Sequence, residues 1–240
     1  MSKLTGKIAV ITGGTGGLGQ SVVTSFLNHG ATVIATHTGN TASMIFIKNT
    51  GIQFQNFDAQ QIDVTDEKNV SNFCQNVMHE YSRVDILCNL VGGVSSKNNI
   101  EDMAVEEWEK MLTLNLRSTF FMMKNILPHM KRNQFGRIIN IAARVGLTPE
   151  PQRGGYGVSK ASVIALTKIA AEEAKLTSAD LTVNAIAPSI ILTEENKKWG
   201  TPEDFKKWVT PKEIADAMIY LCSDEAKSIN GQIIQMYGKV

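Results

Sequence analysis

KIAVITGGTGGLG, residues 7–19, is the stretch from which the rest of the chain can be interpreted. It begins as a short apolar, β-branched run, which is typical of a strand buried in a parallel sheet. Five glycines then fall within the seven residues 13–19, and a helix is expected from Gln20 to about His29. Glycines between a strand and a helix let the backbone turn tightly and approach a pyrophosphate, which the helix N-terminus binds. The stretch therefore predicts a dinucleotide-binding loop.

Composition excludes several classes of protein. The 240 residues carry 24 basic and 23 acidic side chains, a net charge of +1, so neither a nucleic-acid surface nor a polybasic membrane patch is indicated. The three cysteines have no metal-ligand spacing and are expected to be buried thiols in a reducing compartment. Because the first strand begins within ten residues of Met1, no signal peptide is expected. We expect a cytoplasmic protein without a metal, nucleic-acid or membrane partner.

Strand and helix patterns alternate along the whole chain, which predicts an α/β fold: one Rossmann-type domain over residues 1–240, with a doubly wound parallel sheet and helices on both faces. Further strands are expected at 31–36, 59–64, 84–88, 137–142, 181–187 and 232–236. Helices are expected at 41–49, 66–81, 105–130, 156–175 and 211–223. Residues 188–205 are expected to be irregular, and 190–210 to form a lid over the substrate. Ligands of such sheets bind beyond the carboxyl ends of the strands, so the residues there are candidates for the site.

A tyrosine and a lysine follow the expected strand at 137–142. Tyr156 and Lys160 are four residues apart, which on a helix places them on one face, one turn apart. A lysine ammonium beside a phenol favours the phenolate and lowers the tyrosine pKa. The pair therefore predicts a tyrosine that transfers a proton near neutral pH.

With these motifs the chain resembles the short-chain dehydrogenase/reductase family over essentially its whole length. The shared motifs are Thr12-Gly13-x-x-x-Gly17-x-Gly19, Asp63-Val64, Asn89-Leu90-Val91-Gly92, Asn115, Tyr156-x-x-x-Lys160 and Pro188-Ser189-x-x-x-Thr193. The resemblance implies an NAD(P)-dependent oxidoreductase in which Tyr156 is the general acid/base, Lys160 holds the nicotinamide ribose and Asn115 holds a relay water. The cofactor-binding residues it implies are Gly13, Thr15, Gly16, Gly17, Leu18, Gly19, Thr36, His37, Asp63, Val64, Asn89, Val91, Gly92, Tyr156, Lys160, Pro188, Ile190 and Thr193.

One departure from the family pattern affects the chemistry. The family has a serine thirteen residues before the tyrosine, and this chain has Ala143 there. Losing such a donor to the reacting oxygen typically costs about 10²–10³ in rate where the donor is needed. Three explanations remain: a non-catalytic member, a substrate that needs no such donor, or a replacement by Arg144 or a water.

The second explanation has a parallel in dihydropteridine reductases, which resemble this chain in having alanine at that position. Their quinonoid substrates are strongly activated acceptors. Residues 193–211 are also similar to the lid of that group. We therefore expect an NAD(P)H-dependent reductase of a small carbonyl or quinonoid compound, with a dihydropteridine as one candidate substrate. The alternatives are a 3-oxoacyl thioester reductase and a catalytically impaired cofactor-binding subunit or scaffold.

The end of the second strand bears on the choice of cofactor. An acid there would bind the ribose 2′-hydroxyl of NAD and repel a 2′-phosphate. Thr36, His37 and Thr38 supply hydroxyls and an imidazole instead, which favours NADP(H) over NAD(H). If His37 were protonated, the preference for NADPH would grow as the pH falls toward about 6.5.

The expected partners are a small-molecule substrate and further copies of the same chain. The helix after Tyr156 carries small residues on more than one face, including Ala161, Ala165 and Ala170. Small residues allow helices of two subunits to pack closely. We expect a homotetramer or a homodimer, as the family resemblance also implies.

Overall fold

The computed structural model describes residues 2–240, which contain one seven-stranded parallel sheet. The strand order is β3-β2-β1-β4-β5-β6-β7. The first strand, β1, lies inside the sheet, β2 and β3 are added on one side of it, and β4 to β7 are added on the other side. The strands are β1 (Ile8–Thr12), β2 (Thr32–His37), β3 (Phe57–Gln61), β4 (Ile86–Asn89), β5 (Phe135–Ile141), β6 (Asp180–Pro188) and β7 (Ile233–Met236). This order creates a switch point beside β1, where α/β sheets bind ligands.

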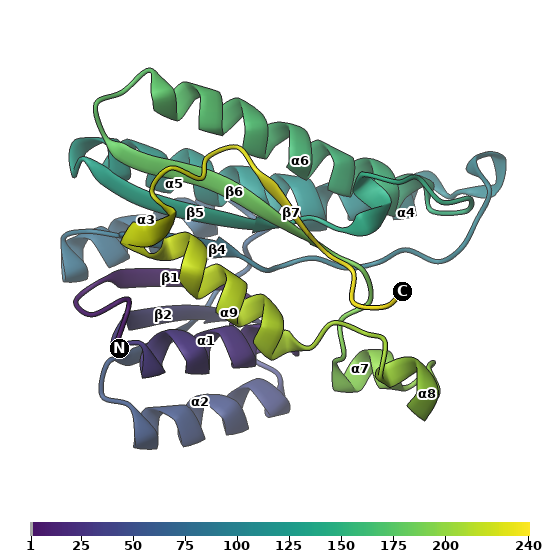
Figure 1. Ribbon diagram of the computed structural model, residues 1–240, viewed down its shortest axis with the longest axis horizontal. Helices are drawn as coiled ribbons and strands as arrows, with labels where there is room; N and C mark the ends of the chain where they lie inside the picture. The colour runs from purple at the N-terminus through teal and green to yellow at the C-terminus, as the bar shows by residue number, and fades with distance from the viewer. Residues whose placement is uncertain (1) are drawn as a thin grey trace.

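Helices cover both faces of the sheet, and Figure 1 shows α3, α5 and α6 on one face with α1, α2 and α9 on the other. The main helices are α1 (Gly19–Asn28), α2 (Thr41–Gln53), α3 (Glu67–Tyr81), α4 (Val105–Met111), α5 (Ser118–Arg132), α6 (Gly154–Lys175) and α9 (Pro211–Cys222). Two short helices, α7 (Glu194–Lys197) and α8 (Pro202–Phe205), lie with α4 at the carboxyl ends of the strands (Figure 1).

Two apolar layers hold this arrangement together. Phe26 of α1 and Met218 of α9 are fully buried on one face, and Met122 of α5 is fully buried on the other. Burying one such side chain contributes about 1.5–3 kcal/mol. The strand β1 lies between the layers, with Val10 paired to Ile34 of β2 and Leu87 of β4. The loop that follows β1 is therefore anchored at the centre of the molecule.

The expected parallel sheet with helices on both faces is confirmed. Two expectations are wrong. The third strand ends at Gln61, so Asp63 and Val64 lie in the turn after it; the last ladder bond runs from the Ile62 N–H to the His37 carbonyl. Residues 188–205 also contain helices α7 and α8, because Thr193 and Thr201 cap their first turns.

The cysteines are not joined by disulfides: Cys74, Cys88 and Cys222 are all buried free thiols. Within residues 2–240, His, Cys, Asp and Glu side chains form no group suited to a metal ion. Over the same range, no helix combines the length and apolar character that crossing a bilayer requires.

Candidate active site

The turn between β1 and α1 has the geometry of a dinucleotide loop. Gly13 has a φ of +64°, a conformation that favours glycine. A Cβ atom on Gly19 would lie 2.1 Å from the Gly13 carbonyl oxygen, so glycine is required where α1 packs against the turn. Leu18 at the helix N-cap is apolar and residues 19–22 are uncharged. The positive end of the α1 dipole thus faces outward without a competing carboxylate, as anion binding requires.

A cavity of about 330 Å³ adjoins this turn at the ends of β1, β2 and β4. Its walls combine backbone from the glycine loop with side chains after β2, β3 and β4. It brings together nine of the expected cofactor-binding residues: Gly13, Thr15, Gly16, Thr36, His37, Asp63, Val64, Val91 and Gly92. Its position and lining suit the adenosine half of a dinucleotide.

Neutral hydroxyl groups dominate one wall of this cavity. The Oγ1 atom of Thr15 lies 2.7 Å from the Oγ of Ser43 in the first turn of α2. The Oγ1 of Thr36 accepts a hydrogen bond of 3.1 Å from the Gly13 N–H. Ser43 was not foreseen from the sequence, because its pairing with Thr15 depends on how α2 packs. This wall offers hydrogen bonds but no formal charge.

His37 lies on the same wall and is buried. Its side chain is 7% exposed, and its Nδ1 atom has no hydrogen-bond partner among the described residues. Burial lowers the pKa of His37 from its ordinary value, because the charged imidazolium loses hydration. The lowered pKa favours the neutral imidazole in the protein alone, which is the less favourable case for a preference for NADPH that depends on a protonated His37.

Asn89 occupies a different place from the other expected cofactor residues. Its Nδ2 atom donates to the Oδ1 of Asn140 over 2.9 Å, and Asn140 donates to the Oγ1 of Thr167 over 2.9 Å. This buried chain of side chains connects β4, β5 and α6. Asn89 thus ties the sheet to α6, whereas the following residues, Leu90, Val91 and Gly92, line the cavity.

Asn115 lies in a π-helical turn, Leu112–Arg117, between α4 and α5. Its Oδ1 accepts from the Gly93 N–H over 2.9 Å, and its Nδ2 donates to the Gly93 carbonyl over 3.1 Å and to the Ser159 Oγ over 3.0 Å. A π-helical turn re-aims a side chain and is frequent at functional sites. Ser159 in turn donates to the Tyr156 carbonyl over 2.8 Å. Asn115 therefore joins the loop after β4 to the helix that carries Tyr156.

Gly93 and Ser159 were missed by the sequence reasoning. Ser159 directly precedes Lys160 and lies three residues after Tyr156, a spacing that could have drawn attention to it. Gly93 contributes only its backbone, so its side chain carries no signal. Space around this junction is limited: a Cβ on Gly92 would lie 2.6 Å from the Asn115 Oδ1 and 3.0 Å from the Lys160 Nζ. The structure thus brings Gly92, Asn115 and Lys160 together.

Tyr156 and Lys160 lie in the first two turns of α6, as expected, but burial controls their ionisation. Burial raises the pKa of Tyr156 to about 12, while the charge of Arg153 acts to lower it and that of Glu150 to raise it. Burial lowers the pKa of Lys160 to about 8, and its Nζ donates to the Ile141 carbonyl over 2.8 Å. Lys160 is not among the groups that shift the pKa of Tyr156, so the expectation that Lys160 lowers this pKa is not met in the protein alone.

Ala143 is buried at the end of β5, directly before the short 3-10 turn Arg144–Gly146. Its methyl group offers no hydrogen bond. The next residue, Arg144, pairs through Nη2 with Glu150 over 2.9 Å. The guanidinium proposed as one replacement for the serine is thus already engaged by a carboxylate.

The segment after β6 reaches back to the glycine loop. A Cβ on Gly17 would lie 3.0 Å from the Cβ of Thr193, so Thr193 packs directly on that loop. Thr193 also caps α7, and Ile191 forms a β-bridge with Val209. Pro188 is the last residue of β6, and Ile190 lies two residues beyond it.

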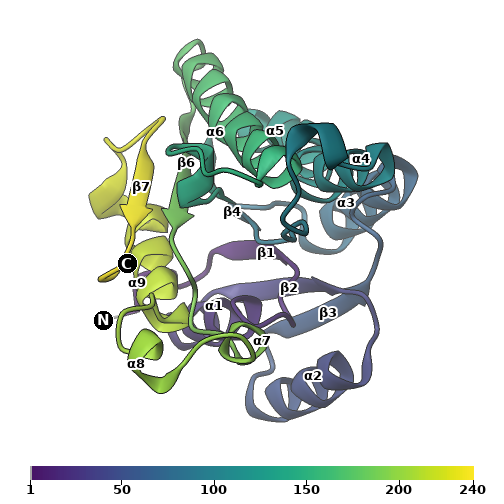
Figure 2. The same cartoon turned by 90° about the vertical axis from the view of Figure 1, so that its right-hand side faces the viewer.

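An aromatic cluster stabilises the same segment. Trp208 is 7% exposed, and its ring lies 5.0 Å from Trp199 and 5.2 Å from Phe205, centroid to centroid. In Figure 2, α7 and α8 lie on the side of the molecule where the carboxyl ends of the strands are found. Trp199 remains 62% exposed. Trp208 is therefore the buried centre of this aromatic cluster, and Trp199 lies on its exposed side.

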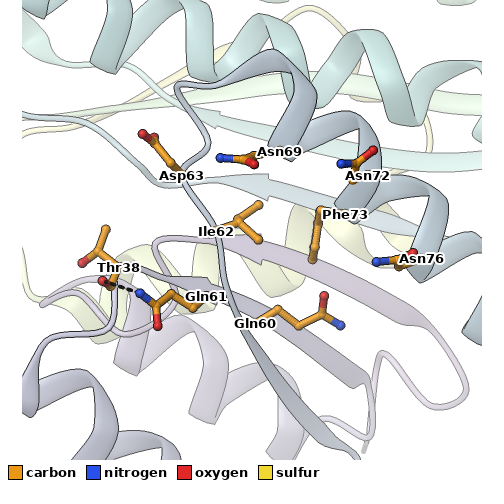
Figure 3. Close-up of a pocket in the computed structure, with 9 residues that line it drawn as sticks. All are labelled: Thr38, Gln60, Gln61, Ile62, Asp63, Asn69, Asn72, Phe73 and Asn76. Atoms are coloured by element: carbon orange, nitrogen blue, oxygen red, sulfur yellow. Dashed lines mark hydrogen bonds between the residues drawn. The ribbon is translucent and has the colours of Figure 1, made fainter.

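A second hollow of about 650 Å³ lies between β3 and α3 (Figure 3). Amide side chains dominate its walls, and the Gln61 Nε2 donates to the Thr38 carbonyl over 3.3 Å. It shares Thr38, Ile62 and Asp63 with the smaller cavity. None of the expected catalytic residues lines either this hollow or the smaller cavity.

Comparison with known sequences agrees with this geometry. Residues 7–204 match the family model described as short chain dehydrogenase. A 3-oxoacyl-[acyl-carrier-protein] reductase FabG from Thermotoga maritima is 30% identical over 246 residues, which cover 98% of each chain. The oxidoreductase YxjF of Bacillus subtilis is 32% identical over 254 residues, which cover 97% of each chain.

Solved structures share the fold. The crystal structure of gox2181 superposes with a TM-score of 0.90 at 25% identity, covering 98% of this chain and 96% of that one. A short-chain type dehydrogenase/reductase from Mycobacterium ulcerans has the same TM-score, 0.90, at 21% identity, and covers 99% of this chain and 90% of its own. Taken with the family model, these relatives show that the chain belongs to the short-chain dehydrogenase family and is an NAD(P)-dependent oxidoreductase.

Proposed function

We propose that this enzyme reduces a small carbonyl or quinonoid acceptor, with Tyr156 delivering the proton to the acceptor oxygen. The observation that carries the proposal is the junction at which Asn115 bonds to Gly93 and Ser159, while Lys160 lies against Gly92. This junction fixes the first turns of α6 and therefore the tyrosine. A bound NAD(P)H would supply the hydride.

Each residue of the site has a separate role, which follows from where it lies. Tyr156 has an ordinary pKa of 10.0 that burial raises to about 12, so its phenol is neutral at pH 7 and holds the proton that the acceptor oxygen takes. Lys160 and the Gly92 backbone lie where the nicotinamide ribose would bind. Asn115 maintains the link between the loop after β4 and α6, and its own carbonyl accepts from the Thr119 hydroxyl over 3.0 Å.

Two observations bear on the acceptor and point to different classes. The FabG relatives are named 3-oxoacyl-[acyl-carrier-protein] reductases, which supports a 3-oxoacyl thioester. Ala143 supports an acceptor that needs no second donor, such as a quinonoid dihydropteridine, because its methyl group cannot stabilise a developing oxyanion. We favour a small activated carbonyl or quinonoid compound, with the 3-oxoacyl thioester as the second candidate.

The cofactor preference is proposed from the wall formed by Thr15, Thr36 and Ser43. These hydroxyls accommodate a 2′-phosphate or a 2′-hydroxyl, and no carboxylate after β2 repels a phosphate. We propose that NADPH binds at least as tightly as NADH.

We also propose that the enzyme is a homotetramer or a homodimer. Ala161, Ala165 and Ile169 form an exposed stripe along α6, and Ile169 is 57% exposed. A stripe of small and apolar residues suits helix packing against a second copy. Sedimentation at micromolar concentration tests this, and a monomer would refute it.

A turnover assay tests the function itself. NADH and NADPH are each offered with quinonoid dihydropterin, an acetoacetyl thioester and a simple quinone. Oxidation of the cofactor with at least one acceptor is expected, and it should be lost in Tyr156→Phe. A wild-type protein that binds the cofactor but reduces none of the three would refute the proposal for these acceptor classes.

A further inference from the structure

Residues 237–240, which follow β7, form a turn against the segment that comes after β6. The Val240 N–H donates to the Tyr237 carbonyl over 3.3 Å and closes the turn. The Ser189 Oγ, one residue beyond β6, donates to the Tyr237 carbonyl over 2.8 Å. Figure 1 shows the C-terminus on the same side of the molecule as α7 and α8. The turn is therefore fixed to the point where residues 190–210, the expected lid, begin.

The same turn contacts the far end of that segment through its backbone. The Lys239 N–H donates to the Lys207 carbonyl over 2.8 Å. Gly238 has a φ of +62°, and a Cβ atom on it would lie 2.2 Å from the same carbonyl oxygen, so glycine is required where the turn packs. Lys207 directly precedes Trp208, the buried centre of the aromatic cluster. The turn thus contacts residues 190–210 near both of their ends.

Residues 190–210 have little support of their own. Helices α7 and α8 have four residues each and contain no buried residue. Helices of this length are not stable alone, because a single turn does not offset the entropy lost in forming it. The buried residues of the segment are Trp208 and Val209. Its packing is therefore concentrated directly after the carbonyl that the turn binds.

A short series of contacts connects the turn to the glycine loop. The Leu192 N–H donates to the Val209 carbonyl over 2.8 Å, and the Val209 N–H donates to the Ile190 carbonyl over 3.0 Å, so the two ends of the segment are paired. Thr193 follows directly, and a Cβ on Gly17 would lie 3.0 Å from the Thr193 Cβ. The position of Thr193 on the loop therefore depends on where the returning end of the segment is held.

We propose that the turn 237–240 holds residues 190–210 against the glycine loop, so that Gly238 and Lys239 are positioning residues for the dinucleotide, although neither contacts it. Opening of such a segment sets the rate at which a bound cofactor leaves. The backbone contacts of the turn oppose that opening and so lower the dissociation constant of the dinucleotide. The inference rests on dinucleotide binding at the glycine loop and on residues 190–210 as the lid, and it does not depend on the identity of the acceptor.

The test compares two glycines in the same backbone conformation. Gly238→Ala places a methyl group against the Lys207 carbonyl and should raise the dissociation constants of NADH and NADPH about tenfold. Gly6→Ala is the matched control, because Gly6 has a φ of +73° but a Cβ on it would have no neighbour within 4 Å. It introduces the same backbone strain and should leave both constants within about twofold of wild type. Fluorescence titration measures binding, and circular dichroism confirms that each variant is folded.

A second pair of variants removes the hydrogen bond and leaves Gly238 unchanged. Lys239→Pro deletes the N–H that the Lys207 carbonyl accepts, and it should weaken dinucleotide binding about threefold or more. Lys239→Ala is the conservative variant: it keeps the N–H, removes only an exposed side chain, and should retain the wild-type affinity.

Trypsin reports the position of the segment without cofactor or turnover. The segment carries four lysines: Lys197, Lys198, Lys206 and Lys207. Cleavage after these lysines, identified by mass spectrometry, should be several-fold faster in Gly238→Ala and Lys239→Pro than in Gly6→Ala, because the segment opens locally more often.

Equal affinity and equal cleavage in Gly238→Ala and Gly6→Ala would overturn the inference. A change in only one of the two measurements would overturn it as well, because opening of the segment and loss of the dinucleotide would then be separate events. If affinity and cleavage change as expected while the wild type reduces no acceptor, the proposed function fails and the role of the turn stands.

Discussion

The two ends of the site are built in different ways. The adenosine end is formed by the backbone turn at Gly13, by the hydroxyl pair of Thr15 and Ser43, and by the buried His37, whose pKa burial lowers. At the tyrosine end, ionisable groups are buried close together, and burial moves Tyr156 and Lys160 toward their uncharged forms. Binding at the adenosine end therefore depends on steric fit, whereas the chemistry at the tyrosine end depends on the ionisation of these groups.

This difference explains why the two ends should respond differently to change. A Cβ atom at the adenosine end collides with backbone, and the effect should be nearly independent of pH. A substitution at the tyrosine end alters the balance between hydration and charge, so its effect should depend on pH. The predictions below are designed to break or sharpen that contrast.

The largest effect on binding and folding is expected for Gly19→Ala. Its Cβ would lie 2.1 Å from the Gly13 carbonyl oxygen, so the turn must shift. We expect the free energy of unfolding to fall by roughly 1–3 kcal/mol and dinucleotide binding to weaken about tenfold or more. Denaturant unfolding and fluorescence titration at pH 7 and pH 9 measure both.

Gly51→Ala in α2 is the matched control, because its Cβ would have no neighbour within 4 Å. It should raise the free energy of unfolding by about 0.5–1 kcal/mol, since alanine is the better helix former. Equal behaviour of the two variants would show that the glycine turn is not sterically constrained.

An effect of intermediate size is expected from the titration of Lys160. Its pKa is lowered to about 8 in the folded protein, below the ordinary value of 10.5. The unfolded chain therefore binds more protons between these values, so Lys160 destabilises the fold at pH 7 and the penalty is relieved as the pH rises. Relative to Lys160→Met, wild-type stability should rise by roughly 2 kcal/mol between pH 7 and pH 9.5.

Urea unfolding of both proteins at the two pH values measures this difference. Using the difference removes contributions common to both proteins, such as that of Tyr156, whose raised pKa makes stability fall as the pH rises above about 10. A constant difference across the range would mean that Lys160 keeps an ordinary pKa.

The smallest effect is expected at His37. Because burial lowers the pKa of His37, less imidazolium forms at pH 6.5 than in an exposed histidine, and the ratio of NADPH to NADH affinity should change less than about twofold between pH 8 and pH 6.5. His37→Asn provides the control for titration of the cofactor phosphate itself. A preference for NADPH that grows at low pH in wild type alone would show that His37 becomes protonated beside the phosphate.

The same contrast governs how far the sequence could be interpreted. The glycine loop, the parallel sheet and the helical placement of Tyr156 and Lys160 follow from periodicity and motif spacing, Asn115 follows from the family resemblance, and the fold is confirmed. The ionisation of Tyr156 and His37 did not follow, because a pKa depends on burial that only packing determines. Ser43 and Gly93 were missed for a related reason: one acts through a tertiary hydrogen bond and the other through its backbone.

Asn89 shows a further limit of motif reasoning. The motif places it at the end of β4, which is correct, but its side chain bonds to Asn140 across the sheet rather than lining the cavity. Neighbouring residues on a strand face opposite sides, so one residue of a motif can be structural while the next forms the site. The short helices α7 and α8 were missed because each contains a single turn that depends on its threonine cap.

The central claim is that Tyr156 supplies the proton to an acceptor that does not need the hydroxyl absent at Ala143. The measurement that tests it most directly compares wild type, Ala143→Ser and Tyr156→Phe on a quinonoid dihydropterin and on a simple β-keto ester. Wild type should reduce the quinonoid acceptor, Ala143→Ser should change that rate little while raising the rate on the ester, and Tyr156→Phe should lose about 10²–10⁴ in kcat/KM. Wild type inert toward both acceptors, with Ala143→Ser active on the ester, would contradict the account.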